Sequence, residues 1–503
     1  MATYYVDYEA ANDTGAGTEL DPWKYCPGDA RSGNSLSADD TVYFKRGVTY
    51  TLDASGPLIA SEATGVTYTV TDWGAGDATI DANSRTSCFD IDHDDCIISG
   101  GSGKNLVLTD GGAGADQPAV HLNEAGLDGV TIEYVRFSTY GDSGSSQGYG
   151  IKIGGDIATY ENIEVSNCDF DTIYDYAIKL SGWSHDCSIH DCDFDNCGKT
   201  NSTVINISQA DNNADGVYDN YVYNNTIHDG REASTDGIAL LNTGNYIYDN
   251  TFYNLARGIS ISYTNYDYYM SKPSEIYRNT IYDCSEAGIS INYTGDDATA
   301  SYPDADAYNK IYSNLLYNNG NYNINVNTYA DGNLFYGNTI YDSGTEGGIY
   351  LSPSCDSNIV KNNAIHVVGS GSDFTLYFAN ANNTEDYNQL YKTQSAYTIS
   401  WNGTPYDNIT TYRSASSQGA NSAWGDPLFV SPTTDFSLQE GSPARDKGVT
   451  LGSPYNVDYL GVSRPQGVAY DIGAYEYYAG GGPDPDPVPP AEGPFAANLM
   501  GIL

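Results

Sequence analysis

Two stretches of this chain share one pattern: NYIYDNTFYNLARGISI at residues 245–261 and EIYRNTIYDCSEAGISI at residues 275–291. Each contains Ile-Tyr-x-Asn-Thr, an apolar residue, a turn and then Gly-Ile-Ser-Ile. Short runs rich in Ile, Tyr and Thr that alternate with period two are typical of β-strands and too short for helices. A strand–turn–strand unit that recurs along the chain predicts a repeat architecture.

The Asn of this unit marks a column that runs along the chain. Its members follow one another at steps of 25, 29, 35, 24 and 25 residues: Asn225, Asn250, Asn279, Asn314, Asn338 and Asn363. Upstream, the same place is taken by Cys192, Cys168 and Val135. An apolar column follows two positions later: Phe137, Phe170, Phe194, Ile227, Phe252, Ile281, Leu316, Ile340 and Ile365.

These columns predict an all-β fold, a right-handed parallel β-helix of about nine or more coils with N- and C-terminal caps. One coil cannot bury its apolar face alone, whereas stacked coils form a continuous core. At a strand spacing of about 4.8 Å, each buried Asn can bond to the backbone and to the Asn above it. We therefore expect Asn279→Leu to destabilise the fold by about 1–3 kcal/mol.

The net charge of −45, with only 21 Lys and Arg residues, argues against binding to nucleic acid or to an anionic membrane surface. The 47 tyrosines suit both stacked strands and surfaces that contact sugars. The opening MATYYVDYEA has no basic or apolar signal region, and no run is long enough for a transmembrane helix. We expect an extracellular or virion protein that is released without a signal peptide.

Nine cysteines, several of them in the inward column, do not indicate a disulfide framework. The stretch HDCSIHDCDFDNC at residues 185–197 combines His, Asp and Cys as a zinc site would. Because the repeat already explains Cys192, buried thiols are the favoured interpretation.

A family resemblance rests on both ends of the chain. YYVDYEAANDTGAGTELDPWKY (4–25) and DDTVYFKRGVTYTL (39–52) resemble the opening of bacterial and phage β-helix proteins of the pectin-lyase type. DPLFV (426–430), DFSLQEGSPARDKG (435–448) and RPQGVAYDIGAYEY (464–477) resemble the closing segment of β-helix proteins with a choice-of-anchor Q domain. The resemblance implies the fold, which hosts lyases, hydrolases, adhesins and phage tailspikes.

The change of pattern along the chain predicts five parts. They are an N-terminal cap with the first coils (1–85), the β-helix (86–379), C-terminal coils and cap (380–478), a Gly/Pro-rich linker (479–494) and an apolar docking tail (495–503). Deleting residues 479–503 should leave the β-helix folded and abolish attachment to any larger assembly. Whether the chain forms a homo-oligomer stays open.

Long insertions fall after the Gly-Ile-x-Ile strands, at residues 208–220, 262–275 and 292–309. Stacked at one corner, they would gather aromatic faces and carboxylates, which suit stacking on sugars and bonding to hydroxyls. The predicted carbohydrate-binding residues are Tyr263, Tyr266, Tyr268, Tyr269, Tyr293, Asp296, Asp297 and Tyr302, with Asp304 and Asp306 beside them. Solvated loops without a ligand are the alternative.

Three patterns have catalytic interpretations. Lys152 in GIKI and Lys179 in AIKL occupy the same outward place on neighbouring coils, and polysaccharide lyases of this fold use basic residues of this kind. Asp236 in STDG resembles the Asn-Thr-Asp motif of polygalacturonases, although the other motifs of that family are missing here. Asp296 with Asp304 would be a carboxylate pair for glycoside hydrolysis. The alternatives are that Lys152 and Lys179 lie on a solvated face and that Asp236 is a turn residue, and we favour them.

One loop has the spacing of a calcium site. In DNNADG, Asp211, Asn213 and Asp215 alternate before Gly216, and Asp219 lies further along. Val222 stands where the bidentate Glu of a helix-loop-helix calcium site would be, so an Asn/Asp-rich turn is the alternative. If calcium binds, it should raise the melting temperature, and Asp211→Ala and Asp215→Ala should reduce that gain.

The sequence thus predicts a β-helix surface protein, a spike, fibre or decoration protein, that presents a carbohydrate-binding face and attaches through its C-terminal tail. Its expected partners are a surface polysaccharide and a larger assembly, and calcium is the one cofactor considered. A polysaccharide lyase or glycoside hydrolase and a purely structural filament or coat subunit are the alternatives. We favour a binding role over an enzyme.

Overall fold

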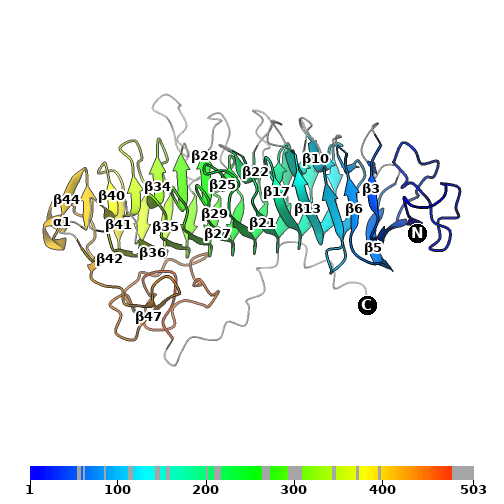
Figure 1. Cartoon of the computed structure of the whole chain (residues 1–503). Helices are drawn as coiled ribbons and strands as arrows, with labels where there is room; N and C mark the ends of the chain where they lie inside the picture. Colours follow the sequence, from blue (N-terminus) through cyan, green and yellow to red (C-terminus); the bar gives the residue numbers. More distant parts are fainter. Residues whose placement is uncertain are drawn as a thin grey trace. The chain divides into compact units, whose positions relative to one another are not determined.

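The computed structural model divides the chain into two compact units, residues 1–242 (unit 1) and 243–503 (unit 2). It describes residues 1–53, 58–59, 63–83, 87–110, 117–141, 148–154, 159–199, 202–208, 217–262, 272–292, 309–342, 347–369, 373–394 and 398–478. The described residues form short strands and one α-helix (Figure 1). None of them belongs to a helix long and apolar enough to cross a membrane.

In unit 1, the chain visits three parallel sheets in turn, here called sheets I, II and III. Sheet I contains β1 (Thr3–Val6), β2 (Thr41–Arg46), β5 (Thr67–Gly74), β8 (Ile97–Ser99), β12 (Thr131–Glu133), β16 (Glu164–Ser166), β20 (Ser188–His190) and β23 (Tyr221–Tyr223). Sheet II contains β3 (Thr49–Thr51), β6 (Ala78–Asp81), β9 (Leu106–Thr109), β13 (Val135–Tyr140), β17 (Asp169–Ile173), β21 (Asp193–Asp195) and β24 (Thr226–His228). Sheet III contains β4 (Leu58–Ile59), β7 (Phe89–Ile91), β10 (Gln117–Leu122), β14 (Gly148–Ile153), β18 (Ile178–Leu180), β22 (Thr203–Ile207) and β25 (Asp236–Leu240). A small fourth sheet contains β11 (Leu127–Asp128), β15 (Thr159–Glu161) and β19 (Trp183–His185).

Unit 2 repeats the same three-sheet pattern. Its sheet I contains β26 (Tyr246–Tyr248), β29 (Glu275–Tyr277), β32 (Lys310–Tyr312), β35 (Leu334–Tyr336), β38 (Ile359–Lys361) and β41 (Thr384–Asp386). Its sheet II contains β27 (Thr251–Tyr253), β30 (Thr280–Tyr282), β33 (Leu315–Tyr317), β36 (Thr339–Asp342), β39 (Ala364–Val367), β42 (Gln389–Lys392) and β45 (Ala423–Trp424). Its sheet III contains β28 (Ile259–Ser262), β31 (Ile289–Asn292), β34 (Tyr322–Asn327), β37 (Gly347–Leu351), β40 (Phe374–Phe378), β43 (Ile399–Trp401) and β44 (Thr404–Tyr406). Consecutive coils stacked in parallel register confirm the predicted parallel β-helix.

The predicted Asn column lies inside unit 2 as a chain of hydrogen bonds. The side-chain amide of each Asn donates to the carbonyl oxygen of the Asn on the next coil, at 3.0 Å from Asn279 to Asn314 and at 3.0 Å from Asn314 to Asn338. All three side chains are fully buried. The apolar column beside them, Phe252, Ile281, Leu316, Ile340 and Ile365, is also fully buried. Both columns confirm the assignment of the coils.

A second Asn ladder was not predicted. Asn309, Asn333, Asn358 and Asn383 are buried in the other corner of the coil, and the amide of Asn333 donates to Asn358 at 3.0 Å. Each of them comes five residues before a member of the first ladder, which continues beyond Asn363 to Asn388. The two ladders bracket sheet I of unit 2, so the backbone at both of its corners is satisfied by stacked amides.

The corners require a left-handed backbone. The residue directly before the inward Asn or Cys has a positive φ, for example 55° at Asp191, 55° at Asn224 and 56° at Asp249. Asn and Asp adopt this conformation more readily than other residues with a side chain. The repeated Asp-Asn, Asn-Asn and Asp-Cys pairs of the sequence are therefore corner pairs, with one residue turning the chain and the next pointing inward.

The cysteines of residues 185–197 follow this rule. Cys187, Cys192 and Cys197 come directly after three corner residues of one coil, and all three are buried and free. Burial raises the pKa of the Cys187 thiol to about 12. The half-buried His185 and His190 lie before the corners, with ring nitrogens on carboxylates. The described residues hold no metal-ligand group that combines these cysteines with the histidines, and the prediction of buried thiols is confirmed.

Residues 429–478 leave the coils and pack on the outer face of sheet II of unit 2 (Figure 1). They begin with an antiparallel pair, β46 (Phe429–Ser431) and β47 (Asp435–Leu438). The apolar cluster at this contact comprises Leu315, Ala364, Phe429, Phe436, Leu438, Ala444, Ile472 and Ala474. Helix α1 (Ile409–Ser416) precedes this segment and is capped by the Asn408 side chain, which accepts from two backbone amides of its first turn.

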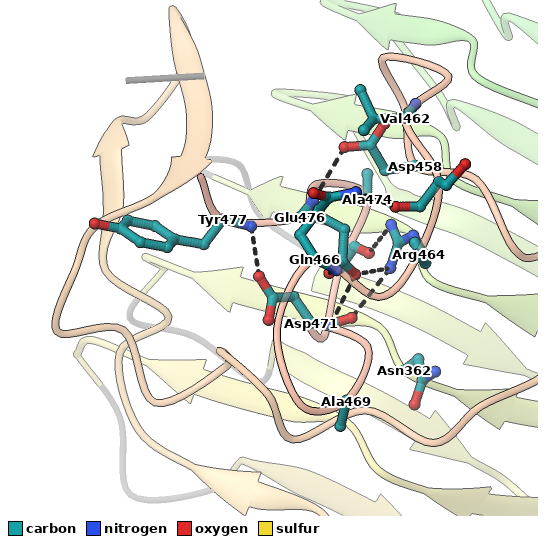
Figure 2. A network of polar contacts seen from close by, with 12 residues as sticks. Asn362, Asp458, Val462, Arg464, Gln466, Ala469, Asp471, Ala474, Glu476 and Tyr477 are labelled. Atoms are coloured by element: carbon teal, nitrogen blue, oxygen red, sulfur yellow. Dashed lines mark hydrogen bonds and ion pairs between the residues drawn. The ribbon is translucent and has the colours of Figure 1, made fainter. Parts of the chain in front are cut away.

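A buried polar network holds this C-terminal segment in shape (Figure 2). The guanidinium of Arg464 donates to the backbone oxygens of Asp471 and Gly473, at 3.1 and 2.8 Å, and lies 3.5 Å from Glu476 Oε1. Glu476 accepts in turn from the backbone amide of Asp471, and Asp458 accepts from that of Glu476. Burial raises the pKa of Asp458, Asp471 and Glu476, that of Glu476 to about 7. The charge of Arg464 acts to lower all three pKa values, but burial outweighs it.

Candidate functional site

Sheet III of unit 1 carries a strip of basic side chains on its outer face. Lys152 of β14 and Lys179 of β18 are register partners, and His121 of β10 pairs with Lys152 on the other side. The flanking Ile and Leu residues point inward and are fully buried. His121 lies with its Nδ1 3.5 Å from Asp90 Oδ1. We call His121, Lys152 and Lys179 the lysine strip.

Two aromatic rings lie beside the lysines. Tyr149 and Tyr176 stack with their ring centroids 5.6 Å apart and their planes 8° from parallel. The ammonium of Lys152 lies 5.8 Å from the Tyr149 centroid, and that of Lys179 lies 5.9 and 5.7 Å from the centroids of Tyr149 and Tyr176. These distances are within the range of cation–π attraction, which holds each ammonium close to the sheet.

A buried carboxylate completes this neighbourhood. Asp175 is 2% exposed and accepts from Ser202 Oγ at 2.8 Å and from Lys199 Nζ at 3.1 Å. Burial raises the pKa of Asp175, although Ser202, Lys199 and Lys179 each act to lower it. The arrangement can hold an anionic group against two ammonium groups, and the described residues of this face form no set of metal ligands.

The third residue with a catalytic interpretation lies apart from the lysines. Asp236 is the first residue of β25 and is 6% exposed, and its backbone amide donates to the Ser202 carbonyl. Strand β22 lies between β25 and the strand of Lys179. The structure thus brings Lys152 and Lys179 together as expected, whereas Asp236 starts a buried strand. A catalytic role for any of the three stays a prediction.

Sheet III of unit 2 carries a strip of aromatic side chains instead. Tyr350 of β37 and Tyr377 of β40 are register partners with ring centroids 5.1 Å apart, and Tyr322 of β34 lies 4.9 Å from Tyr350. All three rings are half-buried, so part of each ring faces solvent. The register partners on the neighbouring strands of this sheet are Ser260, Ser290 and Asn325, of which Ser290 is buried. We call Tyr322, Tyr350 and Tyr377 the tyrosine strip, which the sequence reasoning missed although Tyr350 and Tyr377 stand at equivalent places in GIYL and FTLYF.

The predicted carbohydrate-binding residues fall in the segments 263–271 and 293–308, which lie outside the described residues. Their segments follow directly on β28 and β31 of sheet III, the sheet that carries the tyrosine strip. The calcium residues Asp211, Asn213 and Asp215 also lie outside the described part. Asp219 is described: it turns a corner with φ 51°, its carbonyl accepts from the Asp186 amide, and the buried Asn220 follows it. The repeat therefore accounts for Asp219, and calcium binding stays a prediction.

No known protein-family profile matches the chain. It is 30% identical over 189 residues to the uncharacterized protein YwoF of Bacillus subtilis (strain 168), a match that spans 34% of this chain and 38% of that protein. Among solved structures, it is similar to the tailspike protein of E. coli bacteriophage HK620 in complex with pentasaccharide, with a TM-score of 0.47 and 11% identity over 76% of this chain and 73% of that one. A double mutant of that tailspike with pentasaccharide gives a TM-score of 0.45 and 12% identity over the same shares. The β-helix assignment rests on the strand order and register above.

Proposed function

We propose that this protein is a β-helix surface protein that binds carbohydrate on sheet III of unit 2. The observation that carries the proposal is the tyrosine strip: three neighbouring rings, each partly open to solvent, on the outer face of a rigid sheet. Several other tyrosines of unit 2 are covered, whereas Tyr253 and Tyr282 of sheet II are half-buried as the strip is. The Tyr317 and Tyr341 rings pack against Phe436, and the Tyr312 ring is buried.

The chemistry of the strip suits a neutral or amino-sugar polymer. Aromatic rings offer flat apolar faces with a polar hydroxyl at one end, at a small cost in conformational entropy. The half-buried Ser260 and Asn325 add a hydroxyl and an amide group on the same face. The net charge of −45 disfavours a polyanion as the main ligand, because long-range repulsion would oppose its approach.

A panel of neutral, amino-containing and acidic polysaccharides tests the proposal by affinity electrophoresis. A neutral or amino-sugar polymer should retard the wild-type chain, and Tyr350→Ser with Tyr377→Ser should remove the retardation. The matched control is Tyr253→Ser with Tyr282→Ser, a stacked pair at 5.2 Å on sheet II. Retention by no polymer, or equal retention of both double variants, would refute the proposal.

A polysaccharide lyase is the second candidate, and the lysine strip is the observation that favours it. Of the two adjacent lysines, one ammonium group could hold the carboxylate of a uronate, while the other lysine, as a neutral amine, takes up the proton next to it and becomes an ammonium group. The test is incubation of the chain with acidic polysaccharides while absorbance from new double bonds is followed, with reducing ends measured for hydrolysis. Activity that disappears in Lys152→Ala and Lys179→Ala would establish an enzyme.

Attachment through the C-terminal tail completes the proposal. It rests on composition, because Phe495, Leu499, Met500, Ile502 and Leu503 are too apolar for a free polar end. A chain lacking residues 479–503 should keep its carbohydrate binding and lose association with a larger particle. Normal assembly of the truncated chain would remove the docking role.

A further inference from the structure

Sheet II of unit 1 gathers carboxylates around one histidine. His228 at the end of β24 is the register partner of Asp195 on β21. Its Nδ1 lies 2.8 Å from Oδ2 of Asp229 and 3.7 Å from Oδ1 of Asp195. On the other side of the ring, Nε2 lies 3.4 Å from Oδ1 of Asp193. The ring is thus held between three carboxylates.

The three groups on the Nδ1 side match the donor set of a transition-metal ion. One atom each from Asp195, His228 and Asp229 lie within 4.8 Å of one another. In a tetrahedral zinc site with bonds of about 2.0–2.2 Å, ligand atoms stand about 3.3–3.5 Å apart. The observed 2.8 and 3.7 Å from Nδ1 bracket that spacing, and the two carboxylate oxygens lie within 4.8 Å of each other, so adjustments of the two Asp side chains would seat an ion. The half-exposed Asp195 and Asp229 have room to make them.

Asp193 supplies the outer contact that such a histidine needs. A histidine that binds metal through one ring nitrogen usually donates its other N–H to a carboxylate, which fixes the ring orientation. Nε2 of His228 faces Asp193, and the ring is 13% exposed, so its position is set by the sheet. Asp193 and Asp195 alternate on one strand, which places the outer carboxylate and the ligand on the same face.

Two corners of the preceding coil provide an internal comparison. His185 and His190 also have Nδ1 against the following Asp, at 2.9 and 2.7 Å. Their rings stack on Tyr218 and Tyr223, and no second carboxylate is placed near their Nδ1 within the described residues. The His-Asp corner alone is therefore a feature of the repeat, and the added Asp195 distinguishes His228.

From this geometry we infer that Asp195, His228 and Asp229 form a binding site for a divalent transition-metal ion of the zinc class, with Asp193 as its positioning residue. Mixed imidazole and carboxylate ligands favour zinc over magnesium or calcium, which prefer oxygen alone. Three protein ligands at the surface leave a coordination position for water or another ligand. The site lies in unit 1 on sheet II, so it goes beyond the proposed carbohydrate face in unit 2.

The test uses the full chain, freed of metal with a chelator and titrated with zinc in excess magnesium and added salt, which suppress loose binding to the acidic surface. Wild type should take up one equivalent, and cobalt in place of zinc should give visible absorption bands. His228→Gln and Asp195→Asn should each lose that equivalent, and Asp193→Asn should weaken binding about tenfold.

The matched control is His190→Gln, which removes a His-Asp corner without touching the proposed ligands and should bind zinc as wild type does. Circular dichroism of each variant shows whether it is folded. The inference is overturned if wild type takes up no zinc against magnesium, or if His228→Gln and Asp195→Asn, both folded, keep the full equivalent.

Discussion

Replacing one buried Asn of the first ladder should lower the stability of unit 2, because several neighbouring groups bond to that one side chain. Asn314 is fully buried in unit 2, and its Oδ1 accepts from the backbone N–H and the side-chain amide of Asn279, both at 3.0 Å. Its own amide donates to the Ile276 carbonyl at 2.9 Å and to Asn338 Oδ1 at 3.0 Å. Asn314→Leu keeps a similar side-chain volume and removes all four bonds.

The size of the destabilisation follows from the hydrogen bonds that the neighbouring residues keep and from those that they lose. Asn338 Oδ1 still accepts from the backbone amide of residue 314, and the Asn279 amide still donates to the Ile247 carbonyl. The buried N–H of Asn279 loses the acceptor that Asn314 supplied, which costs about 1–3 kcal/mol, and the lost bond to Ile276 adds about 1 kcal/mol. We expect a loss of about 2–4 kcal/mol in the free energy of unfolding of unit 2.

Amide hydrogen exchange followed by mass spectrometry measures this loss locally. Peptides covering β29 to β36 should exchange faster in the variant at a fixed pH, by the factor that corresponds to the lost free energy. Asn456→Leu, at an exposed position of the same unit, is the control and should change little. An effect of Asn314→Leu below about 0.5 kcal/mol, the range of ordinary surface substitutions, would refute the ladder as a source of stability.

Two further predictions concern pH. The pKa of Glu476 rises from 4.5 to about 7 on folding, so the folded chain binds more protons than the unfolded chain between these pH values. The stability of residues 429–478 should therefore fall by up to about 3 kcal/mol as the pH rises through this window. Glu476→Gln should remove the dependence, as measured by hydrogen exchange corrected for the intrinsic rate; a pH-independent wild type would contradict it. Burial opposes a charge on His190, but Asp191 and Glu164 outweigh it and raise the pKa to about 9, so this ring stabilises the fold fully below pH 6.5 and loses that contribution as the pH rises through 9. Titration of its ring signals by NMR should show a midpoint near 9, and one near 6.5 would show that the carboxylates do not act on it.

The sequence was sufficient to predict the coils because the repeat is local. Asn279, Asn314 and Asn338 each stand in the same short pattern, so their register could be read without knowing any contact between distant residues. The second ladder could have been found by the same means, since its members Asn309 and Asn333 each stand five residues before a member of the first ladder. The unequal insertions between coils hid this second period.

Features that join distant segments were not predictable in the same way. Phe436 packs on Tyr317 and Tyr341, residues about a hundred positions earlier, and nothing periodic announces that contact. The lysine pair was predicted because Lys152 and Lys179 share a repeat position. The cluster around His228 was missed because Asp195 belongs to another coil, 33 residues earlier, and its side chain is placed by register.

The central claim is that the tyrosine strip binds carbohydrate, and isothermal titration with an oligosaccharide of the retained polymer tests it most directly. Wild type should bind with a measurable enthalpy, and Tyr350→Ser with Tyr377→Ser should lower the affinity at least tenfold, which corresponds to about 1.4 kcal/mol. Tyr253→Ser with Tyr282→Ser should bind as wild type does. Unchanged affinity in the folded Tyr350 and Tyr377 double variant would contradict the claim and place the binding face elsewhere.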